Sequence, residues 1–562
     1  MPNQAMSDRL AGVGASPGRA AGPVYRKAEP PTFDSLTPQQ RELDAPVTAE
    51  QAIAALCAVS DDLAHRSASA RNRGRGVAAD VLRTQSMIAA DSTLANDVTA
   101  RIAAGRDGSE AIAEAIERYK ELLTTHGGYL AERAADLDDI RHRALAYALE
   151  LPQPGVPDPG RPFILVADDL FPSDTALLDP TSVIALVTRR GGPTSHTAIL
   201  AKSLGIPAVV GCAGALDLAD GAVVSVDGST GQVRRVSAKQ AARIQDHARL
   251  ARERLAATTG PGRTRDGHPV PLLLNIGSAA DVQGVDQLEG VGLFRTEFLY
   301  LGRSDTPSAT DQEQAYHEVF AAVGPRKVVL RTLDAGADKP LPFLSMPDEA
   351  NPALGVRGIR VTRNRPELLT SQLEAVAAAA KARDADVWVM APMVTTRAEA
   401  EAFATQVHAA GLDMAGVMIE VPAAALQAHR ILEVVDFLSI GTNDLSQYTL
   451  AADRTNAELA DLLDHWQPAL LQLIGACAAA GTAAGKPVGV CGEAASDPVL
   501  ALVLVGLGIT TLSMSPPSVA AVRASLARHT LDQCRHLADL ALAARDAAEA
   551  RATVAASTAA ES

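Results

Sequence analysis

Apolar residues in the first part of the chain follow a helical spacing. Between positions 45 and 150 they recur every three or four residues, as at Ile112, Ile116 and Tyr119. Side chains at this spacing share one face of a helix, so the pattern predicts a small bundle of helices packed through their apolar faces. A run that contains five prolines, residues 152–162, cannot continue a helix and marks a linker after the bundle.

The next stretch, residues 162–237, contains short runs that are typical of strands. These runs are FILVA, VIALVT, PAVVG and AVVSVD. A Gly-Gly-Pro turn and one helix-like stretch interrupt them, which indicates a compact α/β module. The opening segment AGVGASPGRAAGPVYR is expected to add a strand or two to this module, and a helix is predicted from Ala238 to Ala257.

Buried-type strands alternate with helical patterns from about residue 270 onward. The candidate strands are PLLLNI, GVGLF, KVVLR, DVWVMA, GVMIE, FLSIG, PVGVC and TTLSM. Strand and helix units over a span near the roughly 250 residues of such barrels favour a closed (β/α)₈ barrel. Periodicity alone also allows an open doubly wound sheet.

These patterns predict a multidomain chain of α and α/β domains. We expect a strand segment that packs on the α/β module at 1–30, the helical bundle at 31–150, the α/β module with its following helix at 151–257, the barrel at 258–530 and an alanine-rich tail at 531–562. The tail shows no strand pattern, and we expect a helix that frays into disorder.

Composition and charge narrow the class of protein. The chain has 562 residues, of which 47% are hydrophobic, so it can bury several cores. A formal net charge of -15 argues against a nucleic-acid or anionic membrane surface, since both need clustered Lys and Arg. We find no run of about 20 apolar residues and no signal-like start, so we expect a cytoplasmic protein without direct membrane insertion. The five scattered cysteines favour neither a disulfide framework nor a structural zinc site.

Polar residues stand where the predicted barrel strands end, which is where barrels place their catalytic groups. Taken singly, each could cap a helix or lie in a solvated loop. Taken together, they would leave unpaired charge in a cleft unless an anion and a metal ion occupied it. The residues are Arg295, Arg331, Glu420, Asn443, Asp444, Cys491 and Glu493.

The residue types indicate the ligand. Arg295 and Arg331, with Arg454 in AADRTN, offer planar donors that suit a small phosphorylated acid. Glu420 and Asp444 offer hard oxygen ligands that favour Mg²⁺. At the end of a strand, Cys491 is either a small buried apolar residue or, because its ordinary pKa leaves it protonated at neutral pH, a proton donor to a carbon nucleophile.

A second candidate site lies in the run TRRGGPTSHTAILAKSLGIPAVVG. Thr194 and Ser195 offer capping hydroxyls to a helix that is predicted to start near His196. A phosphate on this imidazole would be stabilised by the backbone N–H groups of the helix N-terminus. A histidine at this place alone is also compatible with capping or packing.

Several motifs, in order, resemble enzyme I of the bacterial phosphoenolpyruvate:sugar phosphotransferase system. The resemblance runs from AGVGASPG to about residue 525, and motifs in a fixed order are more specific than any one of them. The motifs are GGPTSHTAILAKSLGIPAVVG, GLFRTEFLY, RTLDAGADKPLPF, NPALGVRGIR, VMIEVP, SIGTNDLSQYTLAADRTN and VCGE.

The resemblance implies that the barrel binds phosphoenolpyruvate and Mg²⁺, and that His196 is phosphorylated at Nε2 and passes the group to the phosphocarrier protein HPr. It assigns Thr175 to a hydrogen bond with the imidazole. It implies that the helical domain docks HPr, that the α/β module swivels between its two partners and that the barrels form a homodimer. By position, Arg295, Arg331, Asn443, Asp444 and Arg454 match the substrate-binding residues, Glu420 and Asp444 the magnesium ligands, and Cys491 the donor that protonates the enolate to pyruvate.

The chain departs from the family pattern at two positions. Pro193 stands where an Arg is frequent, and Lys202 replaces an Arg beyond the histidine. These changes put phosphate gating and rate in question. Some relatives have a His where Gln85 falls, and we assign that position no role.

Two other functions are compatible with parts of the sequence. A phosphoenolpyruvate synthase or a pyruvate phosphate dikinase would share the histidine module and the barrel but needs a large ATP-binding domain, for which the upstream region has no GxxxxGK[ST] loop. A catalytically silent regulator that binds phosphoenolpyruvate would be expected to lack the histidine, a metal carboxylate or the cysteine, and all of these are present.

Overall fold

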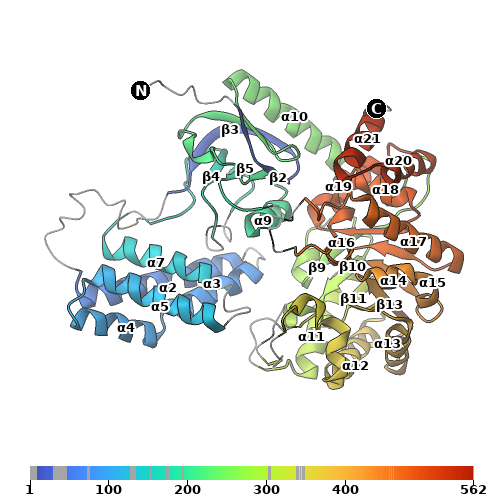
Figure 1. The fold of residues 1–562 in the computed structure, drawn as a ribbon, viewed down its shortest axis with the longest axis horizontal. Coiled ribbons are helices and arrows are strands. Elements are labelled where there is room, and N and C mark those ends of the chain that lie inside the picture. The colour runs from blue at the N-terminus through green and yellow to red at the C-terminus, as the bar shows by residue number, and fades with distance from the viewer. Residues whose placement is uncertain are drawn as a thin grey trace. The chain divides into compact units, whose positions relative to one another are not determined.

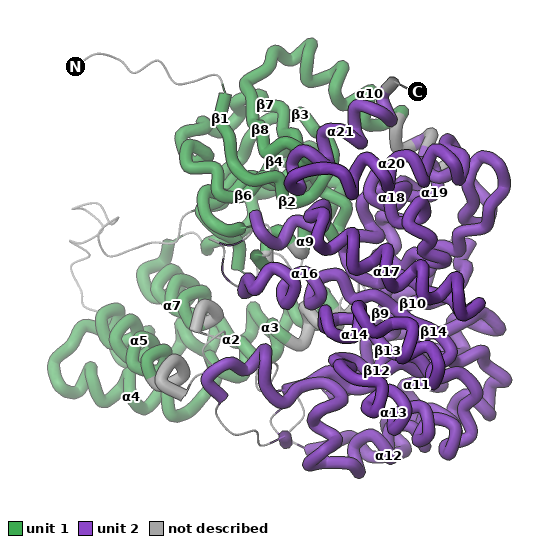
Figure 2. The backbone as a smooth tube through the Cα atoms, turned by 45° about the vertical axis from the view of Figure 1, so that its right-hand side comes forward, with its two compact units in different colours: residues 1–250 green, residues 251–562 purple. Residues whose placement is uncertain are grey.

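The computed structural model divides into two compact units, residues 1–250 and residues 251–562, which Figure 2 distinguishes by colour. Each unit is described by itself. The structure describes residues 9–28, 47–72, 76–126, 134–151, 153–171, 174, 178–192, 195–285, 287–300, 305–336, 341, 343–344, 349–454, 456, 459 and 461–560.

Helices form the part of the first unit between β3 and β4, as the apolar spacing predicts (Figure 1). Their buried faces share one core that includes Leu56, Leu63, Ile112 and Ile116. The start of α4 has a local cause, because the Asp91 side chain accepts a hydrogen bond from the Thr93 N–H. The helices are α2 (Ala49–Asn72), α3 (Gly76–Ala89), α4 (Ser92–Ala103), α5 (Gly108–His126) and α7 (Ala134–Ala148).

An eight-stranded sheet forms the rest of the first unit, in the order β1-β8-β7-β3-β4-β5-β6-β2. Strands β3 to β6 run parallel, and the other pairs are antiparallel. The opening segment AGVGASPGRAAGPVYR contributes β2 and β3, as expected from the sequence, and β1 ends at its first residue. The strands are β1 (Arg9–Ala11), β2 (Val13–Ser16), β3 (Arg19–Arg26), β4 (Phe163–Ala167), β5 (Val183–Thr188), β6 (Ala208–Val210), β7 (Val223–Asp227) and β8 (Gln232–Arg235).

The helix α9 (His196–Leu204) follows β5 in this sheet and carries the candidate histidine at its first position. It ends at Gly205, whose φ of 65° is a left-handed conformation that glycine adopts without a steric penalty. A longer helix, α10 (Ala238–Ala257), follows the sheet.

The second unit contains a closed barrel of eight parallel strands, in which β16 pairs back to β9. The predicted barrel is therefore confirmed, and the open doubly wound sheet is wrong. The strands are β9 (Leu272–Ile276), β10 (Val291–Arg295), β11 (Val328–Arg331), β12 (Val387–Ala391), β13 (Met414–Ile419), β14 (Phe437–Ile440), β15 (Val488–Val490) and β16 (Thr511–Met514).

Alternation along each barrel strand separates two cores. On β13, Ala415, Val417 and Ile419 face the surrounding helices, whereas Met418 joins the buried cluster inside the barrel. The longer helices around the strands are α11 (Ala309–Val323), α12 (Pro366–Arg383), α13 (Arg397–Ala409), α16 (Thr442–Leu450), α17 (Pro468–Ala484), α18 (Leu500–Gly506) and α19 (Pro516–Leu526).

The alanine-rich segment after residue 530 is not the frayed tail that we expected. It forms two helices, α20 (Leu531–Ala543) and α21 (Ala547–Ala560). Leu537, Ala550 and Val554 are buried in the same core as the barrel strands. Alanine side chains let helices approach closely, so a low content of large apolar residues did not prevent packing here.

None of the helices in the described part of the chain has the length and apolar character that crossing a membrane requires.

Candidate active site

Polar side chains from five strands meet at one end of the barrel. Arg295 ends β10, Arg331 ends β11, and Glu420 and Cys491 directly follow β13 and β15. Asp444 lies in the first turn of α16, directly after β14. Because all eight strands are parallel, their carboxyl ends share the same face of the barrel.

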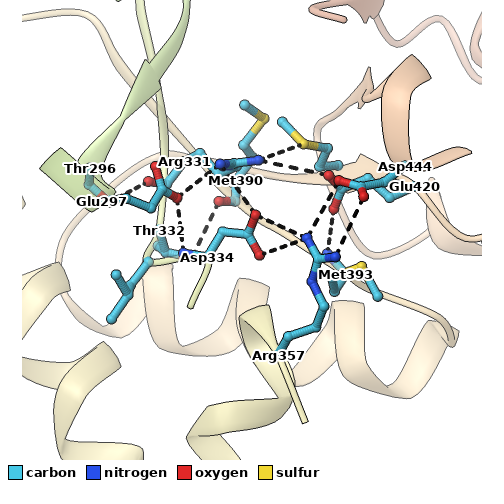
Figure 3. Close-up of polar contacts among 12 residues, drawn as sticks. Thr296, Glu297, Arg331, Thr332, Asp334, Arg357, Met390, Met393, Glu420 and Asp444 are labelled. Carbon is cyan, nitrogen blue, oxygen red and sulfur yellow. Dashed lines mark hydrogen bonds and ion pairs between the residues drawn. The ribbon is translucent and has the colours of Figure 1, made fainter. Parts of the chain in front are cut away.

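Arg331 lies at the centre of this group, with only 8% of its surface exposed. Its guanidinium is 2.9 Å from Glu297, 3.4 Å from Asp334 and 3.8 Å from Glu420 (Figure 3). Burial alone would lower the pKa of Arg331, but the three carboxylates outweigh it and raise the pKa. The result is a permanently charged donor in a fixed orientation.

Arg357 is a second buried arginine that our reasoning about strand ends missed. It follows no strand and is fully buried, and its guanidinium lies 3.3 Å from Asp334 and 3.4 Å from Asp444. Figure 3 shows Asp334 between Arg331 and Arg357. The missed residues Glu297, Asp334 and Arg357 all fall inside motifs that carry the family resemblance, which was the signal available in the sequence.

Glu420 and Asp444 are buried carboxylates beside these arginines, with 1% and 5% of their surfaces exposed. One Glu420 oxygen accepts a hydrogen bond of 2.8 Å from the Met393 N–H. Burial raises the pKa of Glu420 to about 8, and repulsion from Asp444 and Asp334 acts in the same direction. A cation bound to this carboxylate would reverse the shift.

Among the described residues there is no group of three or more His, Cys, Asp and Glu side chains that could hold a metal ion by itself. Mg²⁺, however, is usually held by one or two carboxylates together with substrate oxygens. The two buried carboxylates Glu420 and Asp444 are compatible with that donor set.

Three further predicted residues lie at the carboxyl end of the barrel strands, which we call the mouth. Arg295 is exposed at the surface. Desolvation by the surrounding protein, and then repulsion from Arg331, lower the pKa of Arg295. A bound anion would counteract this shift. Arg454 lies 3.3 Å from Asp444 through its guanidinium. The side-chain oxygen of Asn443 accepts a hydrogen bond of 3.4 Å from the backbone N–H of Glu493.

Cys491 is buried at the same end of the barrel, with 3% of its surface exposed. Burial raises the pKa of its thiol, and a hydrogen bond with Ser439 partly opposes this effect. The thiol is therefore protonated at neutral pH, and its nearest carbonyl partner is Ile440 at 3.6 Å. Such a group can donate a proton but is a poor nucleophile.

The candidate histidine lies in the first unit, at the N-terminus of α9. Ser195 caps this helix, since its side chain accepts a hydrogen bond of 3.3 Å from the Ala198 N–H. Thr197, in the first turn, donates to Asp169 at 3.1 Å. The His196 side chain and the residues Thr175, Pro193 and Thr194 lie outside what the structure describes.

Three family models match the chain in sequence. The PEP-binding domain of PEP-utilising enzymes matches residues 252–531, the mobile domain matches residues 159–231, and the N-terminal domain matches residues 11–133. The first covers the barrel with its buried arginines, and the second covers His196.

Relatives match over nearly the whole length. A phosphoenolpyruvate-protein phosphotransferase of Streptomyces coelicolor is 50% identical, over 97% of this chain and 98% of the relative. One of Bacillus subtilis is 35% identical, over 92% and 94%. A solution structure of an Enzyme I protein is 28% identical over 43% of this chain and 99% of its own, with a TM-score of 0.37. On the full-length sequence matches, the chain belongs to the phosphoenolpyruvate-protein phosphotransferase family.

Proposed function

We propose that this protein transfers the phosphoryl group of phosphoenolpyruvate to its own His196 and then to the phosphocarrier protein HPr, with release of pyruvate. The observation that carries the proposal is the buried Arg331, which three carboxylates hold in place at the carboxyl end of the barrel. A strongly desolvated cation at that face suits an anionic substrate. The family membership indicates that phosphoenolpyruvate is the phosphoryl donor and that a protein is the acceptor.

Arginines would bind the two anionic groups of the substrate. Arg295 ends β10 and Arg331 ends the neighbouring strand β11. Arg454 lies in the segment after α16. Guanidinium groups match phosphate and carboxylate oxygens with paired donors. The side-chain amide of Asn443 supplies a further polar group at this edge.

Glu420 and Asp444 would hold Mg²⁺ together with oxygens of the substrate. When bound there, the ion neutralises negative charge on the enolate and phosphate oxygens. In its absence the raised pKa of Glu420 keeps that carboxyl largely protonated near neutral pH, which lowers the cost of its burial.

His196 would accept the phosphoryl group in line with the departing enolate oxygen. The bond between the phosphorus and that oxygen breaks while a bond from the imidazole nitrogen to the phosphorus forms. The first N–H groups of α9 point toward this end of the helix and favour an anion there. The family resemblance assigns to Thr175 a hydrogen bond that orients the imidazole.

Cys491 would complete the reaction by protonating the enolate. Its S–H bond breaks and a C–H bond forms at the methylene carbon, which gives the methyl group of pyruvate. The buried, protonated thiol described above is suited to this step.

Two partners follow from the proposal. HPr would receive the phosphoryl group from His196 after docking on the helices of the first unit, and a second copy of the chain would bind through the barrel. His196 and the buried arginines belong to different units, and the α/β module of the first unit would swivel to serve the barrel and HPr in turn.

Labelled phosphoenolpyruvate tests the proposal. We expect the protein to take up acid-labile phosphate in the presence of Mg²⁺ without nucleotide, and His196→Ala to take up none. The exposed His247 offers a control, because His247→Ala removes a histidine outside the site and should label normally. Label that persists in His196→Ala, or wild-type protein that takes none, would contradict the proposal.

A further inference from the structure

The interior of the barrel has an apolar half and a polar half. Strands β10 to β13 contribute apolar side chains to the inner cluster, namely Leu293, Val329, Met390 and Met418. Strands β14 to β16 and β9 turn other residues inward, because their alternate positions face the helices. These inward residues are Ser439, Gly489, Thr511, Ser513 and Asn275, together with the apolar Phe437 and Leu273, so this half is the more polar of the two.

A narrow cavity lies inside the barrel between these inward hydroxyls and the apolar side chains of Val329, Trp388 and Phe437. Its lining includes Lys327 and Pro487, which directly precede β11 and β15, and Thr511, which begins β16. It also includes Cys491, at the opposite end of the strands. The cavity therefore extends from the amino-terminal face of the barrel to the thiol, and it is partly open to solvent.

The cavity is suited to water. The space in which the centre of a water molecule fits is about 20 Å³, and one water needs roughly 10–15 Å³ of such space and two to four polar partners. The hydroxyls of Ser439, Thr511 and Ser513 line it and supply those partners.

Two glycines leave room for these hydroxyls. A Cβ atom at position 489 would lie 2.4 Å from the Thr511 oxygen, and one at position 292 would lie 2.5 Å from the Ser513 oxygen. Such distances are too short for any side chain, so the strands can carry inward hydroxyls here only because their neighbours are glycines.

Hydrogen bonds connect the polar half to Cys491. The Ser513 hydroxyl donates to the Asn275 side-chain oxygen at 2.6 Å, and the Asn275 amide donates to the Cys491 carbonyl at 2.9 Å. Ser439 lines the same cavity as Cys491. Cys491 lies at the same end of the barrel strands as the charged residues Arg295, Arg331 and Glu420.

We propose that the polar half of the barrel holds water that returns a proton to Cys491 from the amino-terminal face. The inference rests on the proposed function, because the thiol needs a proton back only if it protonates the enolate. The thiolate takes a proton from the adjacent water, and the hydroxide left behind takes one from bulk solvent through the cavity. The mouth is a poorer route as long as product occupies it and excludes water.

Deuterium loss from pyruvate measures this step. Pyruvate with a deuterated methyl group is incubated in ordinary water with Mg²⁺ and protein that phosphoenolpyruvate has phosphorylated. In the reverse reaction Cys491 takes a deuteron from the methyl group of pyruvate. Pyruvate then loses deuterium only if the deuteron on Cys491 exchanges with solvent. The first-turnover labelling of His196 is measured in parallel, because it precedes protonation and does not need the exchange.

Thr511→Val keeps the shape of the side chain and removes the hydroxyl, and Ser513→Ala removes the next one. We expect deuterium loss to fall about fivefold to tenfold in each, as for the loss of one hydrogen bond, with first-turnover labelling unchanged. Ser525→Ala deletes a hydroxyl that is also buried but lies in α19 outside the cavity lining, and it should behave as wild type.

Deuterium loss at the wild-type rate in both variants would overturn the inference, as would an equal fall in deuterium loss and labelling. Wild-type protein that takes no label on His196 would instead overturn the proposed function, and the inference with it.

Discussion

At the scale of single residues, the main feature of the barrel mouth is the burial of charged side chains. Arg357 and Asp334 are both fully buried, and their charges are compensated by each other and by Asp444 and Arg331. A buried ion pair adds little stability compared with apolar residues, but removal of one partner leaves the other charge uncompensated. The charged residues at this end of the barrel therefore depend on one another, and removal of one is expected to destabilise the protein.

Arg357→Met tests this requirement. We expect a loss of about 3–5 kcal/mol in the free energy of unfolding, because Asp334 and Asp444 would each remain buried with one cation fewer, Arg331 and Arg454 being their remaining partners. Denaturant unfolding measures the loss. Arg363→Met is the matched control, since Arg363 pairs with Glu399 at 2.7 Å on an exposed surface and its loss should cost at most about 1 kcal/mol. Equal effects of the two substitutions would contradict the argument.

The raised pKa of Glu420 predicts how metal binding depends on pH. Below a pKa of about 8 a proton competes with Mg²⁺ for the carboxylate, so the apparent affinity should rise with pH and level off above pH 8. Titration with Mg²⁺ between pH 6 and 9, in the presence of an unreactive substrate analogue, measures it. Glu420→Gln should bind weakly at every pH, and an affinity that does not change below pH 8 would rule the assignment out.

The same shift affects stability in the metal-free protein. The folded-state pKa of Glu420 lies above its ordinary value of 4.5. The stabilisation from the buried neutral acid is therefore present in full below pH 4.5 and is lost as the pH rises through about 8.

At the scale of elements, strand ends and helix starts place the chemistry. The mouth combines residues from the ends of parallel strands, and α9 presents its first turn directly after β5 and its connecting turn. The periodicity of the sequence predicted both elements. The last two helices differ, because their alanine-rich pattern carries little apolar signal although Val554 and Ala550 are fully buried.

Val554→Ala tests whether α21 belongs to the barrel core. We expect a loss of about 2 kcal/mol in the free energy of unfolding, because two buried methyl groups leave a cavity. Thr553→Ala changes the neighbouring exposed position and should alter stability by less than about 0.5 kcal/mol. A frayed tail would instead leave both variants as stable as the wild type.

At the scale of the whole molecule, the proposed reaction is divided between two compact units. The first contains His196 and the second contains the arginines, the carboxylates and Cys491. Each unit has its own hydrophobic cores. A ligand that binds the barrel is therefore expected to raise the unfolding free energy of the second unit and not that of the first.

Calorimetry should resolve separate transitions for the two units. We expect an unreactive phosphoenolpyruvate analogue with Mg²⁺ to stabilise the barrel by about 2.7 kcal/mol at one hundred times its Kd. Val554→Ala identifies the barrel transition, since it should lower that transition alone. A ligand that shifts both transitions equally would show that the units unfold together.

Much of the fold and of the site is encoded locally in the chain. The alternation of apolar residues predicted the bundle, the sheet and the barrel strands, because the periods of helix and strand differ and each buries one face. Strand ends then placed Arg331, Glu420 and Cys491 on one face, since parallel strands end together. These conclusions need no knowledge of which distant residues meet.

Tertiary structure decided what depends on contacts between distant segments. Closure of the barrel depends on β16 reaching β9, and the partners of Arg331 and Arg357 come from several loops. The cavity beside Cys491 exists because small and polar residues of four strands face the same interior. Desolvation, and with it the pKa values of Glu420 and Cys491, arises only when these segments pack, so no local pattern could predict it.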